Sequence, residues 1–262
     1  MKALYTAGTG MRVQQLQVDV IANNLANANT AGFKKSEVAF QDLLYHTVQR
    51  PGLETSQGLV SPTGLQVGSG ARAASTTKVF SQGTVEETGR DLDVAIQGEG
   101  FFQVALPDGS TAYTRDGSFR LDAQGNLVTT DGLRVDPGIV IPADVTSLTI
   151  GKDGTITAST GGAPESATQI GQLQLARFPN PAGLSSEGGN LYRETPSSGA
   201  PVLAAPGEAG MGVTAQRFIE RSNVEVVSEL VGLIVAQRAY EVNSRAIRAG
   251  DDMLGQVSQL GR

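Results

Sequence analysis

The chain has 262 residues, which is enough for one or two domains with an ordinary hydrophobic core. It carries 20 Lys and Arg against 26 Asp and Glu, and the resulting net charge of −6 disfavours contact with phosphate backbones, so nucleic acid is not an expected partner. Cysteine is absent and His46 is the single histidine, which excludes disulfides, thiol catalysis and metal sites built from Cys or several His.

The start of the chain shows no targeting signal. Residues 3–10 read ALYTAGTG and lack the continuous apolar run of a signal peptide. No stretch approaches the roughly 20 apolar residues that a membrane span needs, so membrane insertion is not expected. If the protein leaves the cytoplasm, we expect export without a cleaved signal.

The first 30 residues repeat apolar side chains with the spacing of a helix. Leu4, Met11, Val18 and Leu25 lie seven apart, and Ile21 belongs to an adjacent row. This pattern predicts an amino-terminal helix of about 25 residues.

A second long helix is predicted at the other end, running to about residue 259. Ser222 followed by Glu225 resembles a capping box at its start. The apolar stripe of this helix comprises Val226, Leu230, Leu233, Tyr240, Ile247 and Leu254. The row that begins at Leu230 continues with polar residues, so the stripe is narrow and favours a partner helix over a globular core.

Between the two helices the apolar period changes to two, as in β-strands. Asp-Gly pairs at 108–109, 116–117, 131–132 and 153–154 supply tight turns. We expect a β-meander with strands at residues 101–106, 112–115, 118–121, 126–128, 147–150 and 172–178. Residues 51–70 and 197–212 are rich in Gly, Pro and Ser and are expected to form extended connectors or a long exposed hairpin.

The expected fold class is α+β, with a β-rich central domain of meander and hairpins and with terminal helices that pair as a coiled-coil-like domain. The helix domain is discontinuous, at residues 1–32 and 222–262. A connector at 33–90 and 196–221 holds a short helix and a long extended hairpin, and the β-rich outer domain spans 91–195. In the connector, Phe40, Leu43 and Leu44 predict an apolar helical face followed by His46, a surface or interface residue.

The energetics of the terminal helices point to assembly. Ordering a helix costs about 1–2 kcal/mol per residue in backbone entropy, whereas each buried stripe residue returns about 1.5–3 kcal/mol. Four or five stripe residues are too few to offset that cost, so we expect the helices to be stable only against each other or against neighbouring copies. This layout is typical of an assembly subunit.

Two motifs lie at opposite ends of the chain. Residues 22–34 read ANNLANANTAGFK and residues 237–244 read QRAYEVNS. The first motif alone indicates a polar helix end. The two motifs together nevertheless resemble the terminal signatures of the flagellar rod, hook and hook-associated proteins. The positions that carry the resemblance are Asn23, Asn24, Leu25, Asn27, Thr30, Gly32, Phe33, Gln237, Arg238, Ala239, Tyr240 and Asn243.

The middle of the chain narrows this resemblance. Residues 93–104, DVAIQGEGFFQV, and 113–119, YTRDGSF, are similar to the β-domain core of hook and larger rod proteins. With the chain length, residues 43–52 and the segment SNVE at 222–225, the likeness is greatest to distal rod proteins and covers the whole chain. A proximal rod protein of similar size is the alternative within the family.

The resemblance implies a structural role. A distal rod subunit polymerises into a rigid hollow helical shaft that crosses the periplasm in the flagellar basal body and transmits torque from motor to hook. The implied partners are further copies of the chain, proximal rod proteins, the hook protein, the outer ring proteins and the flagellar type III export apparatus. Residues 50–70 resemble a rod-specific insert that stiffens the shaft.

Catalytic interpretations have little support in the sequence. Asp91 and Asp93 would share one face of a strand as a carboxylate pair, but no His, Cys or second acidic motif joins them. Residues 98–100 lack the third glycine of a dinucleotide loop, and the Asp-Gly turns lack the ligand spacing of a calcium loop. We expect no catalytic residue, cofactor or metal. A β-rich periplasmic enzyme acting on the cell wall is the alternative outside the family.

Overall fold

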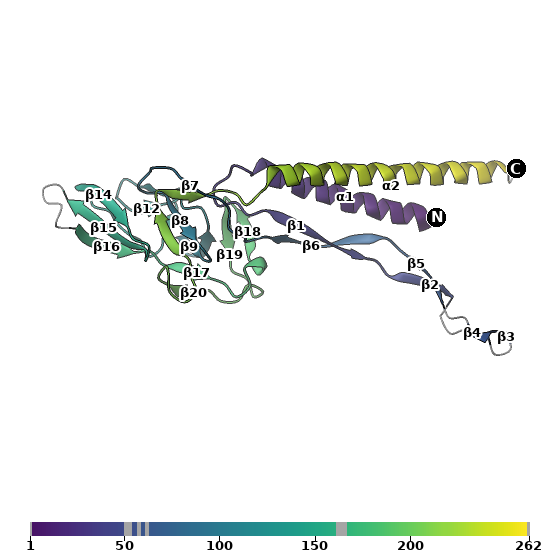
Figure 1. Ribbon diagram of the computed structural model, residues 1–262, viewed down its shortest axis with the longest axis horizontal. Coiled ribbons are helices and arrows are strands. Elements are labelled where there is room, and N and C mark those ends of the chain that lie inside the picture. The colour runs from purple at the N-terminus through teal and green to yellow at the C-terminus, as the bar shows by residue number, and fades with distance from the viewer. Residues whose placement is uncertain (1, 50–53, 57–58, 61–62, 161–166, 261–262) are drawn as a thin grey trace. The chain divides into compact units, whose positions relative to one another are not determined.

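The computed structural model describes residues 2–49, 54–56, 59–60, 63–160 and 167–260. Figure 1 shows a long helix at each end of the chain, with β-strands in the sequence between them, so the α+β class predicted from the sequence is confirmed. The chain divides into two compact units. Unit 1 contains Met1–Leu25, Ser36–Thr77 and Glu225–Arg262, and unit 2 contains Ala26–Lys35 and Lys78–Val224.

The two helices are α1 (Lys2–Ala26) and α2 (Val226–Leu260), close to the predicted spans. They run antiparallel, because Gly10 of α1 approaches Asn243 of α2 while Leu4 approaches Gly250. The predicted capping box is wrong, since α2 begins at Val226 and its first-turn contact is the Ser228 hydroxyl donating to the Glu225 carboxylate. Neither helix is long and apolar enough, over its described residues, to cross a membrane.

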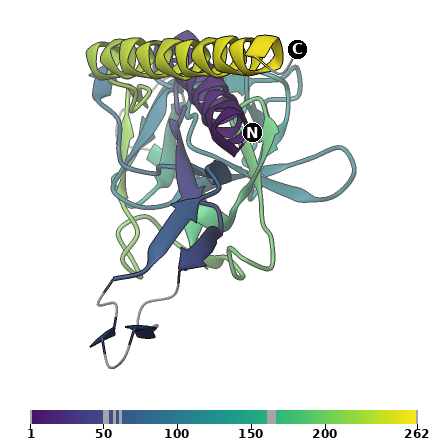
Figure 2. The ribbon, with the colours of Figure 1, turned by 90° about the vertical axis from the view of Figure 1, so that its right-hand side faces the viewer.

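Paired strands complete unit 1 (Figure 2). β1 (Ser36–Asp42) pairs with β6 (Ala71–Lys78), β2 (Tyr45–Gln49) with β5 (Leu65–Gly68), and β3 (Glu54–Ser56) with β4 (Leu59–Val60). The short helix predicted around Phe40, Leu43, Leu44 and His46 is wrong, because these residues lie in or between β1 and β2. Pairing with strands distant in sequence overrides the local helical spacing. The connector predicted at 51–70 falls partly outside the described residues.

The main sheet of unit 2 has nine strands within the described residues, ordered β11-β12-β13-β9-β10-β19-β18, with β17 joining β9 to β20. Their bounds are β9 (Phe101–Ala105), β10 (Thr111–Thr114), β11 (Arg120–Leu121), β12 (Leu127–Val128), β13 (Arg134–Val135), β17 (Leu175–Arg177), β18 (Ser185–Gly188), β19 (Leu191–Arg193) and β20 (Val202–Ala204). The predicted meander is correct for consecutive hairpins and wrong as a whole, because β13 returns to β9 and β10 pairs with β19.

Smaller strand groups surround this sheet. β14 (Val145–Ile150), β15 (Thr155–Thr160) and β16 (Ala167–Gln172) form a three-stranded sheet. β7 (Val85–Glu87) pairs with β22 (Phe218–Glu220), and β8 (Val94–Gln97) pairs with β21 (Val213–Gln216). A short 3₁₀ helix, η1, spans Pro181–Gly183.

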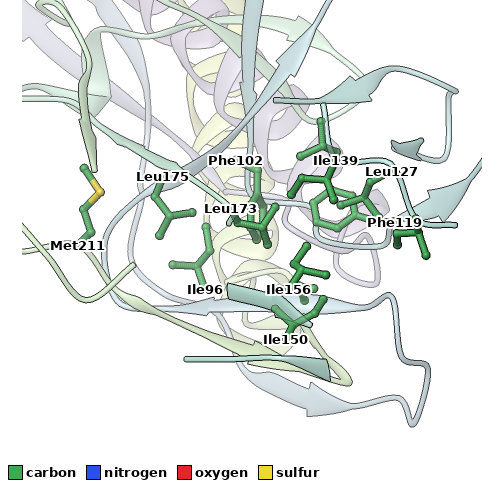
Figure 3. Close-up of a cluster of buried hydrophobic side chains, with 13 residues drawn as sticks. Ile96, Phe102, Phe119, Leu127, Ile139, Ile150, Ile156, Leu173, Leu175 and Met211 are labelled. Atoms are coloured by element: carbon green, nitrogen blue, oxygen red, sulfur yellow. The ribbon is translucent and has the colours of Figure 1, made fainter. Parts of the chain in front are cut away.

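Unit 2 has its own hydrophobic core (Figure 3). Phe102 and Phe119 lie at its centre with their rings edge to face, 5.0 Å between centroids, and Ile96, Ile156 and Leu175 pack in the same cluster. A second buried cluster is formed by aromatic residues that include Phe101, Tyr113, Phe178 and Tyr192. We expect burial on this scale to let unit 2 fold without a partner.

Three turn aspartates hold their loops by hydrogen bonds. The carboxylates of Asp108, Asp122 and Asp153 each accept a bond from the backbone N–H two residues on. Each also accepts a bond from one nearby side chain, respectively Ser110, Asn126 and Thr155. The side-chain bond is the largest cause, and together with the backbone bonds it lowers the pKa of all three carboxyls below 3.8.

We expect unit 2 to lose stability in acid for this reason. A carboxyl whose pKa is lowered on folding stabilises the folded state above its unfolded pKa of about 3.9, and that contribution is lost as the pH falls through the folded value. Thermal melts of wild type between about pH 5 and pH 2 should show a steeper fall in Tm than melts of D108N/D122N/D153N, which keeps one acceptor oxygen at each position without titrating. Equal acid dependence in the two proteins would contradict this.

Candidate assembly surface

The positions of α2 nearest to α1 carry small residues. A Cβ placed on Gly232 would lie 3.3 Å from Cδ1 of Ile21, and a Cβ on Gly250 would lie 2.7 Å from Cδ2 of Leu4. Ala236, one turn after Gly232, is buried. Glycine weakens a helix by about 1 kcal/mol relative to alanine. The close approach of Leu4 explains why α2 has a glycine at position 250, because a larger residue would clash there.

We call the line of close approach between α1 and α2 the seam. The apolar stripe predicted on α1 lies partly in this seam. Ile21 is buried, whereas Leu4, Met11, Val18 and Leu25 are half-buried. The stripe predicted on α2 lies mostly outside the seam. Leu233 and Ile247 are half-buried, and the remaining members are exposed, namely Val226, Leu230, Tyr240 and Leu254.

The amino-terminal half of α2 presents a continuous apolar face to solvent. This face, which we call the outer face of α2, comprises Val227, Leu230, Val231, Ile234 and Val235. Val227 is 70% exposed and Ile234 is 56% exposed, so nothing in the described chain covers them. The spacing i, i+3, i+4, i+7, i+8 is that of one side of a helix. Of these five residues only Leu230 belongs to the stripe predicted from the sequence, although the spacing of all five is visible there.

Asn24, in the amino-terminal motif, connects three elements of unit 1. Its Nδ2 donates to the backbone oxygen of Ser36 at 2.9 Å and to Oε2 of Glu229 at 3.2 Å. Its Oδ1 accepts from the backbone N–H of Ser36 at 2.9 Å. The side chain is buried, so water cannot replace these bonds. Asn24 therefore fixes the start of β1 and the first turn of α2 against α1.

The rest of this motif ends α1 and enters unit 2. The backbone N–H and hydroxyl of Thr30 bond to the backbone oxygen and Oδ1 of Asn27, both at 3.2 Å. Phe33 is buried, with the ammonium of Lys78 4.4 Å from its ring centroid. Asn23 is exposed on α1. The described motif residues thus make contacts that join α1 to β1, α2 and unit 2 within the subunit.

Gly32 occupies a position that other residues cannot fill without strain. Its φ is +68°, and a Cβ would lie 2.5 Å from the backbone nitrogen of Asp116. We expect Gly32→Ala to reduce the free energy of unfolding of unit 2 by more than about 2 kcal/mol, because both the left-handed backbone and the clash oppose it. Urea unfolding measures this loss.

Gly109→Ala is the matched control. Its φ of +82° is also left-handed, but a Cβ there meets no atom within 4 Å. The control should lose only about 1–2 kcal/mol from backbone strain. If Gly32→Ala loses no more than Gly109→Ala, the close approach to Asp116 relaxes freely and the argument fails.

The carboxy-terminal motif lies beside a groove in unit 1. A hollow of about 410 Å³ is lined by Gln15, Val18, Gln237, Tyr240 and Glu241. This hollow brings together one residue of each predicted stripe, Val18 and Tyr240, with the motif residue Gln237. It is a recess on the α1/α2 surface.

Of the other motif residues of α2, some are exposed to solvent and others lie near α1. Arg238 is exposed and lies 3.7 Å from the Glu241 carboxylate, a surface pair of small energetic effect. Ala239 is half-buried. The side chain of Asn243 faces Gly10, where a Cβ would lie 3.0 Å from its Nδ2.

The carboxylate pair considered for catalysis is engaged in ion pairs. Asp93 is fully buried and accepts from Arg90 at 2.8 Å and from the Thr88 hydroxyl at 2.5 Å. Asp91 lies 2.7 Å from Arg217. Among the described residues, no group of three or more acidic or His side chains is placed to hold a metal ion.

Comparison with known proteins agrees with this arrangement. Family models match the chain in three places, described as flagella basal body rod protein (residues 4–34), flagellar hook protein FlgE/F/G D1 domain (95–158) and flagellar basal body rod FlgEFG protein C-terminal (215–260). The flagellar basal-body rod protein FlgG of Caulobacter vibrioides is 51% identical over 99% of both chains. The chain belongs to the FlgG family. The FlgG protein of Borreliella burgdorferi is 46% identical over 100% of this chain and 99% of its own.

Membership in the FlgG family confirms the resemblance seen in the sequence. The family is a structural one of the flagellar basal-body rod, so the chain is a structural protein of the basal body and not an enzyme. The cell-wall enzyme considered from the sequence is therefore not retained. The matched range 4–34 contains Asn24 and Gly32, and the matched range 215–260 contains the outer face of α2.

Proposed function

We propose that this FlgG-family chain is a distal rod subunit that polymerises through its terminal helices into a rigid hollow helical shaft, which transmits torque from motor to hook. The observation that carries the proposal is the exposed outer face of α2. A monomeric protein rarely exposes a contiguous apolar helix face of this kind, because burying each such side chain is worth about 1.5–3 kcal/mol. A second copy is the partner that a rod subunit always has beside it.

A tubular assembly is consistent with the outer face of α2 being a contact between copies. A surface patch that meets a different patch on the next copy generates an open helical assembly. The outer face of α2 and the recess between Val18 and Tyr240 are two such different patches within unit 1. We propose that α1 and α2 also pair as a coiled-coil-like domain, with Leu25 and Leu233 extending the seam around its small residues.

The partners follow from the position in the shaft. We propose contacts with proximal rod proteins at one end, the hook protein at the other and the outer ring proteins around the side, after delivery by the flagellar type III export apparatus. The three-part division predicted from the sequence belongs to this proposal, with residues 1–32 and 222–262 inside and residues 91–195 outside.

The relatives support the distal assignment over other rod proteins. Bacillus subtilis contains FlgG, 39% identical over the full length of both chains, and the flagellar hook-basal body complex protein FlhP, 33% identical over 99% of both. The chain is closer to FlgG than to FlhP in the same organism. The FlgG name is shared by relatives that match over nearly the full length of both chains, and this supports the distal rod over a proximal rod protein of similar size.

Electron microscopy of basal bodies from cells that lack this gene tests the proposal. We expect rods that end short and carry no hook, and we expect normal length to return when the gene is supplied on a plasmid. Complete rods with hooks in the deletion strain would contradict the proposed function.

A further inference from the structure

A buried ionic cluster in unit 2 escaped the sequence analysis. The side chains of Lys34 and Glu220 are fully buried, and Nζ of Lys34 lies 2.5 Å from Oε1 of Glu220. Arg115 is 4% exposed, with its Nη1 3.7 Å from Oε2 of the same carboxylate. Burial lowers the pKa of both Lys34 and Arg115, and the Glu220 charge opposes this lowering. A single carboxylate therefore faces two buried cations.

This cluster lies where the chain enters and leaves unit 2. The boundaries between the units fall at residues 25/26, 35/36, 77/78 and 224/225. Two of these crossings are bonded directly, because the backbone N–H of Val79 donates to the backbone oxygen of Lys35 at 2.9 Å. The ammonium of Lys78 also donates to the backbone oxygen of Lys34 at 3.0 Å.

Asn223, at the crossing before α2, bonds to both of the others. Its Oδ1 accepts from the backbone N–H of Lys35 at 2.8 Å. Its Nδ2 donates to the backbone oxygen of Val79 at 2.8 Å and to Oγ of Ser81 at 3.0 Å. One amide side chain thus joins three separate stretches of backbone.

Glu220, three residues before Asn223, also bonds to the stretches near residues 34 and 83. Its backbone oxygen accepts from the N–H of Gly32 at 2.8 Å. Its Oε1 accepts from Nζ of Lys34 and from the backbone N–H of Gly83 at 2.8 Å. Lys34 in turn donates to the backbone oxygen of Ser81 at 2.7 Å. Lys34, Glu220 and Asn223 therefore each connect at least two of the three stretches, whereas Arg115 contacts only Glu220 among them.

We propose that Glu220 and Asn223 are positioning residues of a single clamp, which holds the crossings at residues 35, 78 and 224 together so that a force entering unit 2 through one crossing is shared by all three. The hydrogen bonds connect each of the three stretches to the other two, so pulling on one stretch puts load on several bonds at once. Burial of Lys34 and Glu220 keeps water from replacing the bond between them when it opens, whereas Asn223 is half-buried. That the protein benefits from sharing force rests on the proposed function, whereas the existence of the clamp does not.

Amide hydrogen exchange of the full chain, measured by NMR, tests whether the clamp is one unit. The informative amides are those of Val79 and Gly83. Their N–H groups donate to Lys35 and Glu220 and not to Asn223, so faster exchange there would show that the effect spreads beyond the bonds of Asn223. In Asn223→Ala we expect both to exchange about tenfold faster or more, while amides of the β9/β10 ladder exchange as in wild type. Asn223→Asp, which keeps the acceptor for Lys35 and loses the donors, should show an intermediate effect.

Arg221→Ala is the matched control. Arg221 lies in the same stretch but is exposed, and its side chain pairs with Glu86 at the surface. Exchange at Val79 and Gly83 should stay at the wild-type rate in this variant. Unchanged exchange at these amides in Asn223→Ala would overturn the clamp, and so would faster exchange across the whole β9/β10 ladder, which would show general destabilisation.

Single-molecule pulling tests the sharing of force without any assembled rod. The chain has no cysteine, so Ala39→Cys and Val227→Cys provide unique attachment points beside two of the crossings. Asn24→Ala is added to every protein compared, because Asn24 also bridges Ser36 and Glu229 between these points. We expect the first extension of Asn223→Ala to occur at a lower force than in wild type and in Arg221→Ala. Equal forces in all three proteins would overturn the proposal while leaving the rod function untouched.

Discussion

An Ile234→Asp variant is expected to fold normally and to fail in assembly. Ile234 is exposed on the outer face of α2, so a carboxylate there remains solvated in the free chain and leaves the melting of unit 2 unchanged. In the polymer the same carboxylate would be buried without a partner, at a cost of several kcal/mol. That cost corresponds to about a hundredfold or greater loss in association between copies. Swimming assays and electron micrographs of basal bodies measure the result.

Three further variants make this test specific. Ile234→Val keeps the apolar face and should assemble and swim normally. Leu233→Asp and Leu25→Asp place the charge at half-buried positions beside the seam, so we expect them to block assembly as well. Normal swimming of the Ile234→Asp strain would show that the outer face of α2 is not an interface.

Shortening the β2/β5 hairpin is expected to make the shaft flexible while the subunit still folds and is exported. Gln49 pairs with Leu65, so replacing residues 50–64 by Asn-Gly closes the hairpin with a two-residue turn. The base of the hairpin, which this variant keeps, exposes large apolar residues, among them Leu44, Val48 and Leu65, that the described subunit does not cover, so we expect the hairpin to contact neighbouring copies along its length. Contacts of this hairpin with neighbouring copies would oppose the sliding between subunits that bending requires. Electron micrographs should show curved rods.

A length-matched variant separates contact from length. Replacing residues 50–64 by a Gly/Ser linker of equal length restores the span without the side chains, and we expect curved rods again. Straight rods in the shortened variant would place the stiffness elsewhere, in the packing of the β-rich units.

Local sequence patterns predicted the elements whose signals are local. The seven-residue repeats gave both helices, and the Asp-Gly pairs gave the turns that bound β9, β10 and β15. The strands β1 and β2 were mistaken for a helix because their pairing with β6 and β5 is decided by residues far along the chain. The same limit hid the buried pair of Lys34 and Glu220, which are 186 positions apart.

The candidate surface was predicted in part for a similar reason. A repeat such as Leu4, Met11, Val18 identifies a helix face that needs a partner, but not which partner covers it. The small residues Gly232 and Ala236 face α1 in the structure, which leaves the larger side chains of α2 for contacts outside the subunit. Only the three-dimensional arrangement distinguishes the two faces.

A cryo-electron microscopy map of the intact rod, resolved to side chains, tests the central claim most directly. We expect the outer face of α2, from Val227 to Val235, to be covered in every copy by a neighbouring copy of the same chain. A map in which this face is open to solvent along the shaft would contradict the account.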